Sequence, residues 1–116
     1  MITGLGIVSP LGCGIHEFWT NLTAGQSGVG PISLFDASSF PVRIGGEVKS
    51  FDPSGVLDRF AVSWSIRDRK VLLGLAAAEQ AIRDSSLSEI DLEDAALALG
   101  VGLEVHAMEH LIGLAI

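Results

Sequence analysis

The sequence of 116 residues lacks several features that mark common classes of protein. Its single cysteine cannot form an internal disulfide bond and argues against a cysteine-rich zinc module. The sequence contains no run of about 18 consecutive apolar residues, which is the length that a membrane-spanning helix needs. The first 42 residues contain no Lys or Arg, whereas a secretory signal begins with basic residues. These absences predict a cytoplasmic protein that does not contact a membrane.

Basic residues are also scarce, with 7 Lys and Arg against 14 Asp and Glu, for a net charge of −7. Residues 1–78 hold six acids and six bases, so the excess of negative charge lies in residues 79–116. A nucleic-acid-binding protein would need a cluster of Lys and Arg on one face. The short basic group of Arg67, Arg69 and Lys70 is interrupted by an aspartate and is typical of a solvated helix face. We therefore expect no nucleic-acid partner.

Apolar residues, in contrast, make up 48% of the sequence, which excludes an intrinsically disordered chain. Apolar residues that recur at every second position indicate strands, and apolar residues three to four positions apart indicate helices. These two patterns divide the chain into segments. In order, the sequence predicts an apolar strand (residues 1–8), a helix (16–24), an irregular excursion (25–56) with extended pieces at 42–44 and 46–48, a largely apolar helix (63–84) ending at two serines, a second apolar strand (95–103) and an apolar helix (105–116). This order is typical of an α/β fold. Two strands buried on both faces need a larger sheet than this segment supplies.

Gly4 and Gly6 follow the start of the first predicted strand and suggest a dinucleotide-binding loop. That loop needs a third glycine or alanine and a helix that begins at once, with its N-terminus aimed at a phosphate. Here Ser9 and Pro10 occupy those positions. The alternative is a tight glycine turn at the end of a strand, which we favour, and no cofactor is expected.

Histidines near the end of the sequence form a second motif. The sequence His106-Ala-Met-Glu109-His110 matches the H-x-x-E-H pattern, in which two histidines on one helix face bind zinc and the glutamate acts as a base. A third ligand would have to come from His16, Glu79 or Glu104 through the fold. A small zinc hydrolase is therefore kept as a remote alternative.

Cys13 stands between two glycines, three residues before His16. A nucleophilic cysteine needs a base, and a helix N-terminus or a cation to lower the pKa of its thiol. Without such a setting a cysteine behaves as a small apolar residue. The second interpretation is favoured for Cys13.

Several segments together resemble the β-ketoacyl-acyl-carrier-protein synthases, a family of condensing enzymes. The resemblance rests on ITGLGIVSPLG (residues 2–12), HEFW (16–19), GQSGVGPI (25–32), FDASSFPVRIGGEV (35–48), FDP (51–53), DR (68–69) and AAA (76–78). It covers essentially the whole sequence. The family has a thiolase-like fold with two similar α/β halves, so residues 1–116 would form a partial β-ketoacyl synthase N-terminal domain.

The resemblance also implies an activity and partners. The family is an acyltransferase family that carries out a decarboxylative Claisen condensation in fatty-acid or polyketide synthesis, with acyl carrier protein as partner and a homodimer as the full-length form. The catalytic cysteine and histidines of the family match none of Cys13, His16, His106 and His110, so no catalytic residue and no activity are expected of these 116 residues alone. Leu103 falls where the family often has an apolar residue that touches the acyl pocket.

One departure from the family pattern bears on partners. Basic residues that precede the long helix in bacterial relatives and help to dock the carrier protein are replaced here by Val62, Ser65 and Ile66. A non-catalytic partner, resembling a chain-length factor or serving as a dimerising module, is the second interpretation of this sequence.

Overall fold

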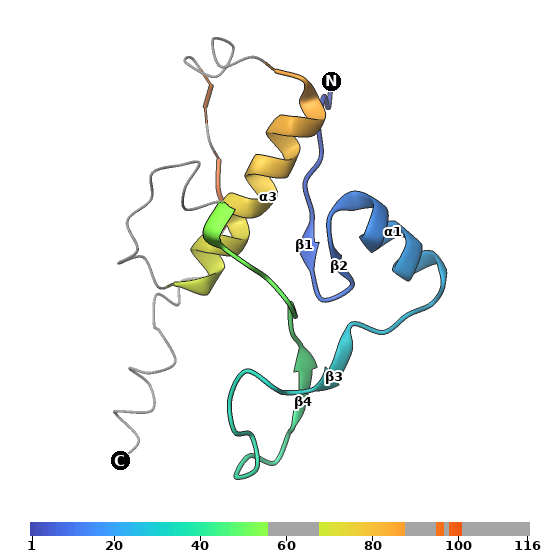
Figure 1. Cartoon of the computed structure of the whole chain (residues 1–116), viewed down its shortest axis with the longest axis vertical. Helices are drawn as coiled ribbons and strands as arrows, with labels where there is room; N and C mark the ends of the chain where they lie inside the picture. Colours follow the sequence, from blue (N-terminus) through green and yellow to red (C-terminus); the bar gives the residue numbers. More distant parts are fainter. Residues whose placement is uncertain (56–67, 88–94, 97, 101–116) are drawn as a thin grey trace.

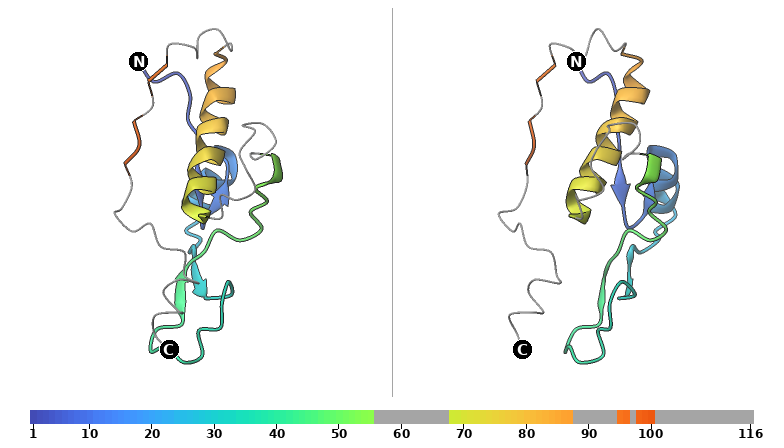
Figure 2. Two further views of the ribbon diagram at one scale, coloured as in Figure 1. Left: turned by 90° about the vertical axis from the view of Figure 1, so that its left-hand side faces the viewer. Right: turned by 60° about the vertical axis from the view of Figure 1, so that its left-hand side comes forward.

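The computed structural model describes residues 1–55, 68–87, 95–96 and 98–100 (Figure 1). Its elements are β1 (Val8–Ser9), β2 (Gly12–Cys13), α1 (Ile15–Thr23), β3 (Val29–Pro31), β4 (Ile44–Gly46) and α3 (Arg69–Ser85). β1 pairs with β2, and β3 pairs with β4, each as an antiparallel hairpin. Helices α3 and α1 flank the β1–β2 hairpin (Figure 1). The β3–β4 hairpin extends away from both helices, as two further views also show (Figure 2).

The prediction of a strand over residues 1–8 is wrong for most of that segment, because β1 includes only its last residue. The preceding residues run alongside α3. The backbone N–H groups of Leu5 and Ile7 donate to the side chains of Asp84 (2.9 Å) and Gln80 (3.0 Å) on that helix. Polar side chains of a helix thus take the hydrogen bonds that a neighbouring strand would otherwise take.

Gly4 and Gly6 allow this close contact with α3. A Cβ atom on Gly6 would overlap the carbonyl oxygen of Ala77 and lie 2.8 Å from the backbone nitrogen of Ala81. A Cβ atom on Gly4 would overlap the carbonyl oxygen of Ala81 and lie 2.6 Å from the backbone nitrogen of Ser85. The prediction of a glycine turn is therefore also wrong, since neither glycine has a positive φ. Glycine is needed at both positions because a side chain would not fit against α3.

The helix predicted over residues 16–24 is confirmed as α1, one residue earlier. Gly14, with φ of 129°, is its N-cap, and Glu17 places a negative charge in the first turn, where the helix dipole favours it. Gly25 follows the C-cap with φ of 69°, in the left-handed region that glycine adopts without strain. The expected apolar face is only partly covered, since Trp19 is 62% exposed.

The long helix predicted over residues 63–84 begins later than expected. Asp68 has an extended backbone (φ −71°, ψ 107°), and its side chain accepts the N–H of Lys70 at 3.0 Å, so Asp68 is the N-cap of α3. A continuous helix through Asp68 is therefore ruled out. The predicted end is confirmed, because Ser86 adopts the left-handed conformation with φ of 57°. Although the sequence of this helix is largely apolar, Ala76 is the only apolar residue of α3 that is buried.

The sequence predicted extended backbone near only one strand of the β3–β4 hairpin. Strand β4 overlaps each of the two extended pieces predicted at residues 42–44 and 46–48 by one residue, and β3 was not predicted. The pair Pro31–Ile44 sets the register, and a hydrogen bond from the Ile32 N–H to the Arg43 carbonyl (3.0 Å) continues it toward the tip. Pairing with a distant segment, which sequence periods do not reveal, decides where these strands lie.

The strand predicted over residues 95–103 is not found at the positions that the structure describes, 95–96 and 98–100. No strand of the described part pairs with them, and a strand without a partner leaves its backbone unsatisfied. The helix predicted over residues 105–116 lies outside the described residues. Within the described part, no helix is long and apolar enough to cross a membrane.

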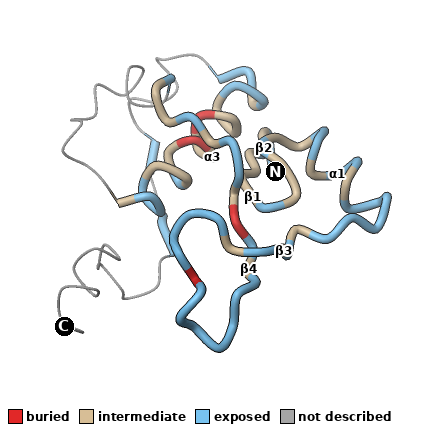
Figure 3. The backbone as a smooth tube through the Cα atoms, turned by 60° about the horizontal axis from the view of Figure 1, so that its bottom comes forward, coloured by how far each residue is buried: buried red, intermediate tan, exposed pale blue. Residues whose placement is uncertain are grey.

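The described residues build almost no apolar core (Figure 3). The buried apolar residues among them are Ala37 and Ala76, and two carboxylates, Glu47 and Glu79, are buried as well. None of the described side chains is fully buried. The fold is therefore held by backbone contacts and polar anchors more than by packing of large side chains.

Candidate functional site

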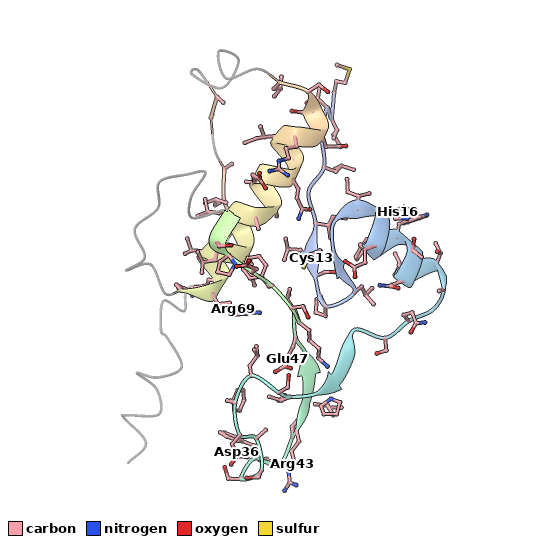
Figure 4. The ribbon with its side chains drawn as sticks, viewed as in Figure 1. Cys13, His16, Asp36, Arg43, Glu47 and Arg69 are labelled. Atoms are coloured by element: carbon pink, nitrogen blue, oxygen red, sulfur yellow. The ribbon has the colours of Figure 1, made fainter. Side chains whose placement is uncertain are left out.

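Two open hollows share Cys13 and Ser50 in their lining. Cys13 lies between α3 and α1 (Figure 4). The first, of about 290 Å³, extends toward α1 and is lined by Glu17 among others. The second, of about 320 Å³, extends toward α3 and is lined by Glu79 and Arg83 among others. Strand β2 and the segment after β4 thus bring Cys13 and Ser50 together from distant parts of the sequence.

The environment of Cys13 disfavours a nucleophilic thiolate. Burial and the carboxylate of Glu17 raise the pKa of the Cys13 thiol above its ordinary value of 9.0, and the opposing effect of Arg69 is smaller. The backbone N–H of Cys13 donates to the same carboxylate at 2.9 Å. His16 is exposed and points away from Cys13 (Figure 4). The thiol is therefore protonated near neutral pH, and His16 is not placed to act as its base.

This environment predicts opposite effects of two substitutions on alkylation of Cys13. Glu17→Gln removes the carboxylate charge but keeps an acceptor oxygen for the Cys13 N–H, so the pKa of the thiol falls and alkylation at pH 8 becomes faster. Arg69→Gln removes a cation that favours the Cys13 thiolate, so alkylation becomes slower. The check is the rate of reaction with iodoacetamide against pH, with circular dichroism to confirm folding. An unchanged or slower rate in Glu17→Gln would contradict this account.

Glu47, just after β4, is a buried carboxylate that accepts several hydrogen bonds. Its oxygens accept the backbone N–H of Ser33 (2.9 Å), the backbone N–H of Leu34 (3.0 Å) and the Ser33 hydroxyl (2.8 Å). These bonds, first those from the backbone of Leu34 and Ser33, hold the pKa of Glu47 below its ordinary value. Glu47 therefore closes the β3–β4 hairpin as a buried anion.

The role of Glu47 was not recognised from the sequence. The available signal was one acidic residue in the otherwise uncharged, extended segment Ile44-Gly45-Gly46-Glu47-Val48. A short-range pattern cannot show which N–H groups would surround it, because Ser33 and Leu34 lie 14 and 13 residues away.

Arg69 connects the start of α3 to the segment after β4. Its guanidinium donates to the carbonyl of Val48 (2.6 Å) and lies 5.6 Å from the centre of the Phe51 ring, within the range of a cation–π interaction. The neighbouring Lys70 forms an ion pair with Asp68 at 3.6 Å. These two bases therefore already have partners within the chain.

The residues that the sequence singled out near the C-terminal end lie outside the described residues: Leu103, His106, Glu109 and His110. Among the described residues, no group of three or more His, Cys, Asp or Glu side chains is placed to hold a metal ion. Of the ligands considered for a zinc site, Glu79 forms an ion pair with Arg83, and His16 is exposed. The zinc alternative stays a prediction.

Comparison with known proteins decides the family. The family model of the beta-ketoacyl synthase N-terminal domain matches residues 1–114. The chain belongs to the β-ketoacyl synthase family. It is 45% identical over 105 residues to the 3-oxoacyl-[acyl-carrier-protein] synthase 2 of Coxiella burnetii, which is 89% of this chain and 25% of that protein. It is 42% identical over 87 residues to the tetracenomycin polyketide synthase ketoacyl synthase beta subunit of Streptomyces glaucescens (75% of this chain, 21% of that protein).

A solved structure agrees with this assignment. The ishigamide ketosynthase/chain length factor matches with a TM-score of 0.68 and 35% identity, over 78% of this chain and 22% of that chain. The resemblance found in the sequence and the predicted fold class, the N-terminal portion of a thiolase-like α/β fold, are thereby confirmed. This β-ketoacyl synthase chain spans about a quarter of the length of the curated relatives it matches.

Proposed function

We propose that this chain is the N-terminal scaffold of an acyl-carrier-protein-dependent condensing enzyme. The reaction would join an acyl group to a malonyl group with loss of CO₂, in fatty-acid or polyketide synthesis. The observation that carries the proposal is the family match over residues 1–114, together with 45% identity to a 3-oxoacyl-[acyl-carrier-protein] synthase. Residues 1–116 would form a partial β-ketoacyl synthase N-terminal domain.

The described residues support a scaffolding role. Condensation needs a cysteine thiolate that carries the acyl group and groups that stabilise an enolate. Cys13 has a raised pKa and His16 is exposed and turned away from it, so this pair supplies neither. We therefore expect no catalytic residue in this chain and no condensing activity from it alone. Leu103, if it lines the acyl pocket, would be its substrate-contacting residue.

Acyl carrier protein as a partner, a homodimer as the complete form and a cytoplasmic location are parts of the same proposal. Carrier docking at the start of α3 would need free cations. Arg69 and Lys70 already have partners in the chain, so we expect them to contribute less to docking than the bases of bacterial relatives.

A second candidate is a non-catalytic partner subunit that resembles a chain-length factor. Similarity to a ketoacyl synthase beta subunit and to a ketosynthase/chain length factor structure favours it. The gene region after the Ile116 codon distinguishes the two candidates. A downstream cysteine in a Thr-Ala-Cys-like setting supports the condensing enzyme, and its replacement by another residue supports the partner subunit.

A chimera tests the scaffold proposal directly. The matched 105 residues of the Coxiella burnetii synthase would be replaced by those of this chain, and condensation of acyl and malonyl groups on acyl carrier protein would be measured. We expect a folded chimera with condensing activity, and no activity from the 116-residue chain alone. A folded chimera without activity, or an active isolated chain, would refute the proposal.

A further inference from the structure

The β3–β4 hairpin is joined to the rest of the chain at a narrow base (Figures 1 and 2). In the described part of the chain, neither of its strands packs extensively against α1 or α3. At the base, a Cβ atom on Gly28 or Gly46 would lie 2.8 Å or 3.2 Å from the side chain of Pro10, in the β1–β2 turn. The hairpin thus rests on one proline ring through the backbone of two glycines, and such a contact does little to fix its angle to the helices.

Each of the two segments that connect the hairpin to the helices contains a residue with left-handed backbone. Gly25, with φ of 69°, lies before β3, and Ser50, with φ of 56°, lies after β4. Glycine adopts this conformation without strain, whereas serine persists in it only when its surroundings hold it there. Hinges between parts of a protein are formed by a few loop positions that absorb large changes of φ and ψ. Gly25 and Ser50 stand where a hinge of this hairpin would lie.

Arg69 contacts the second connecting segment on both sides of Ser50 (Figure 4). Its guanidinium donates to the carbonyl of Val48 at 2.6 Å, two residues before Ser50, and lies 5.6 Å from the centre of the Phe51 ring, one residue after it. A hydrogen bond from a charged donor is stronger than a neutral one, so this contact offsets the strain at Ser50. The bond to Val48 is also exposed to water, which can replace it.

We propose that the β3–β4 hairpin is a hinged flap that turns as a unit about Gly25 and Ser50, and that Arg69 is the latch that keeps it in the observed position. The hydrogen bonds to Glu47 hold the flap together while it turns. Lys49 and Ser50 line the first hollow, so the position of the flap sets the width of that hollow. This inference goes beyond the proposed condensing function and does not depend on it.

The distance between two spin labels tests the proposal. Val42→Cys places one label on the hairpin, and Leu87→Cys places the other just after the end of α3; both positions are exposed. The labels would be attached to the 116-residue chain that also carries Cys13→Ser. Double electron–electron resonance would give the distribution of their distance in this parent chain and in each variant, with circular dichroism to confirm folding.

Arg69→Gln removes the latch, and Lys70→Gln, the matched control, removes the neighbouring charge, whose partner is Asp68. We expect Arg69→Gln to raise the share of molecules with a displaced label distance about tenfold, the factor that the loss of one hydrogen bond to a charged group gives. Lys70→Gln is expected to match the parent. Hydrogen exchange at Leu34 is expected to stay unchanged in Arg69→Gln, because the hairpin moves without opening.

Three results of this comparison would overturn the inference. They are the parent's distance distribution in Arg69→Gln, an equal displacement in Lys70→Gln, and faster exchange at Leu34, which would show that the hairpin opens instead of turning.

Ser50→Val tests the hinge with Arg69 intact. A β-branched residue resists the left-handed region, so this variant is expected to displace the label distance in the same direction as Arg69→Gln. It also decides the question if Arg69→Gln does not fold. A distribution like that of the parent in Ser50→Val would contradict the hinge. Failure of both variants to fold would show that this contact serves folding and not movement, which would also overturn the inference.

Discussion

Gly6→Ala is expected to destabilise the chain by about 3 kcal/mol, at the upper end of what overpacking costs. The new Cβ atom would overlap the carbonyl oxygen of Ala77 and lie 2.8 Å from the backbone nitrogen of Ala81. Both are backbone atoms of α3 and cannot rotate away as a side chain would. The segment before β1 must then move off the helix and lose the bonds from Leu5 and Ile7 to Asp84 and Gln80.

Gly74→Ala is the matched control for this prediction. Gly74 lies on α3 with open space around its Cβ position, so the same substitution is expected to stabilise the helix by about 0.5–1 kcal/mol. Urea unfolding followed by circular dichroism measures both changes, and hydrogen exchange at the Ile7 amide reports release of the N-terminal segment. Equal effects of the two substitutions would contradict the close contact between Gly6 and α3.

Glu47→Ala is expected to open the β3–β4 hairpin. It removes the partly buried hydrogen bonds that the N–H groups of Ser33 and Leu34 and the Ser33 hydroxyl donate to the carboxylate, and hydrogen bonds to a charged group contribute more to stability than neutral ones. Glu47→Gln keeps one acceptor oxygen and is expected to have a smaller effect. Hydrogen exchange at Ser33 and Leu34 and the thermal melting curve measure the loss. Unchanged exchange at Leu34 in Glu47→Ala would refute the anchoring role.

The same carboxylate predicts a dependence of stability on pH. Because folding lowers the pKa of Glu47 below its ordinary value of 4.5, its contribution is fully present above about that pH. It is lost as the pH falls through the lower pKa of the folded chain. Asp36 and Asp52, whose pKa values are also lowered by bonds from Ser38 and Ser54, add to the acid sensitivity.

Melting curves between pH 3 and pH 6 separate these contributions. Glu47→Gln is expected to flatten the acid limb of the stability curve, while Asp36→Asn, at an exposed turn, leaves the Glu47 part of it in place. If stability at low pH depends on pH in the same way in Glu47→Gln, the pKa of Glu47 does not differ between the folded and unfolded chains.

Local features of the sequence predicted α1 and the end of α3, but not where α3 begins. The spacing of apolar residues around Phe18 and Leu22 and the glycine at position 25 were enough to place α1. The two serines after residue 84 were enough to end α3. Helical bonds join residues four apart, so the information lies within a short segment. Family membership was also readable, because it rests on long ordered motifs.

The strands and the anchoring residues were not readable in the same way. The strand expected over residues 1–8 became an extended segment on α3, since hydrogen bonds from Leu5 and Ile7 go to side chains 79 and 73 residues away. The anchoring role of Glu47 was missed for the same reason, because its partners Ser33 and Leu34 are distant in the sequence. Contacts between distant segments decide both, and no local period encodes them.

The sequence by itself determined the acidic charge, the position of α1, the end of α3, the α/β class and the family of this protein. Tertiary structure alone decided that Gly4 and Gly6 serve contact with a helix, that Cys13 lies beside Glu17 and Arg69, and that Glu47 closes a hairpin. The physical reason is that space, desolvation and charge act between atoms that the fold, and not the order of residues, brings within a few ångströms of one another.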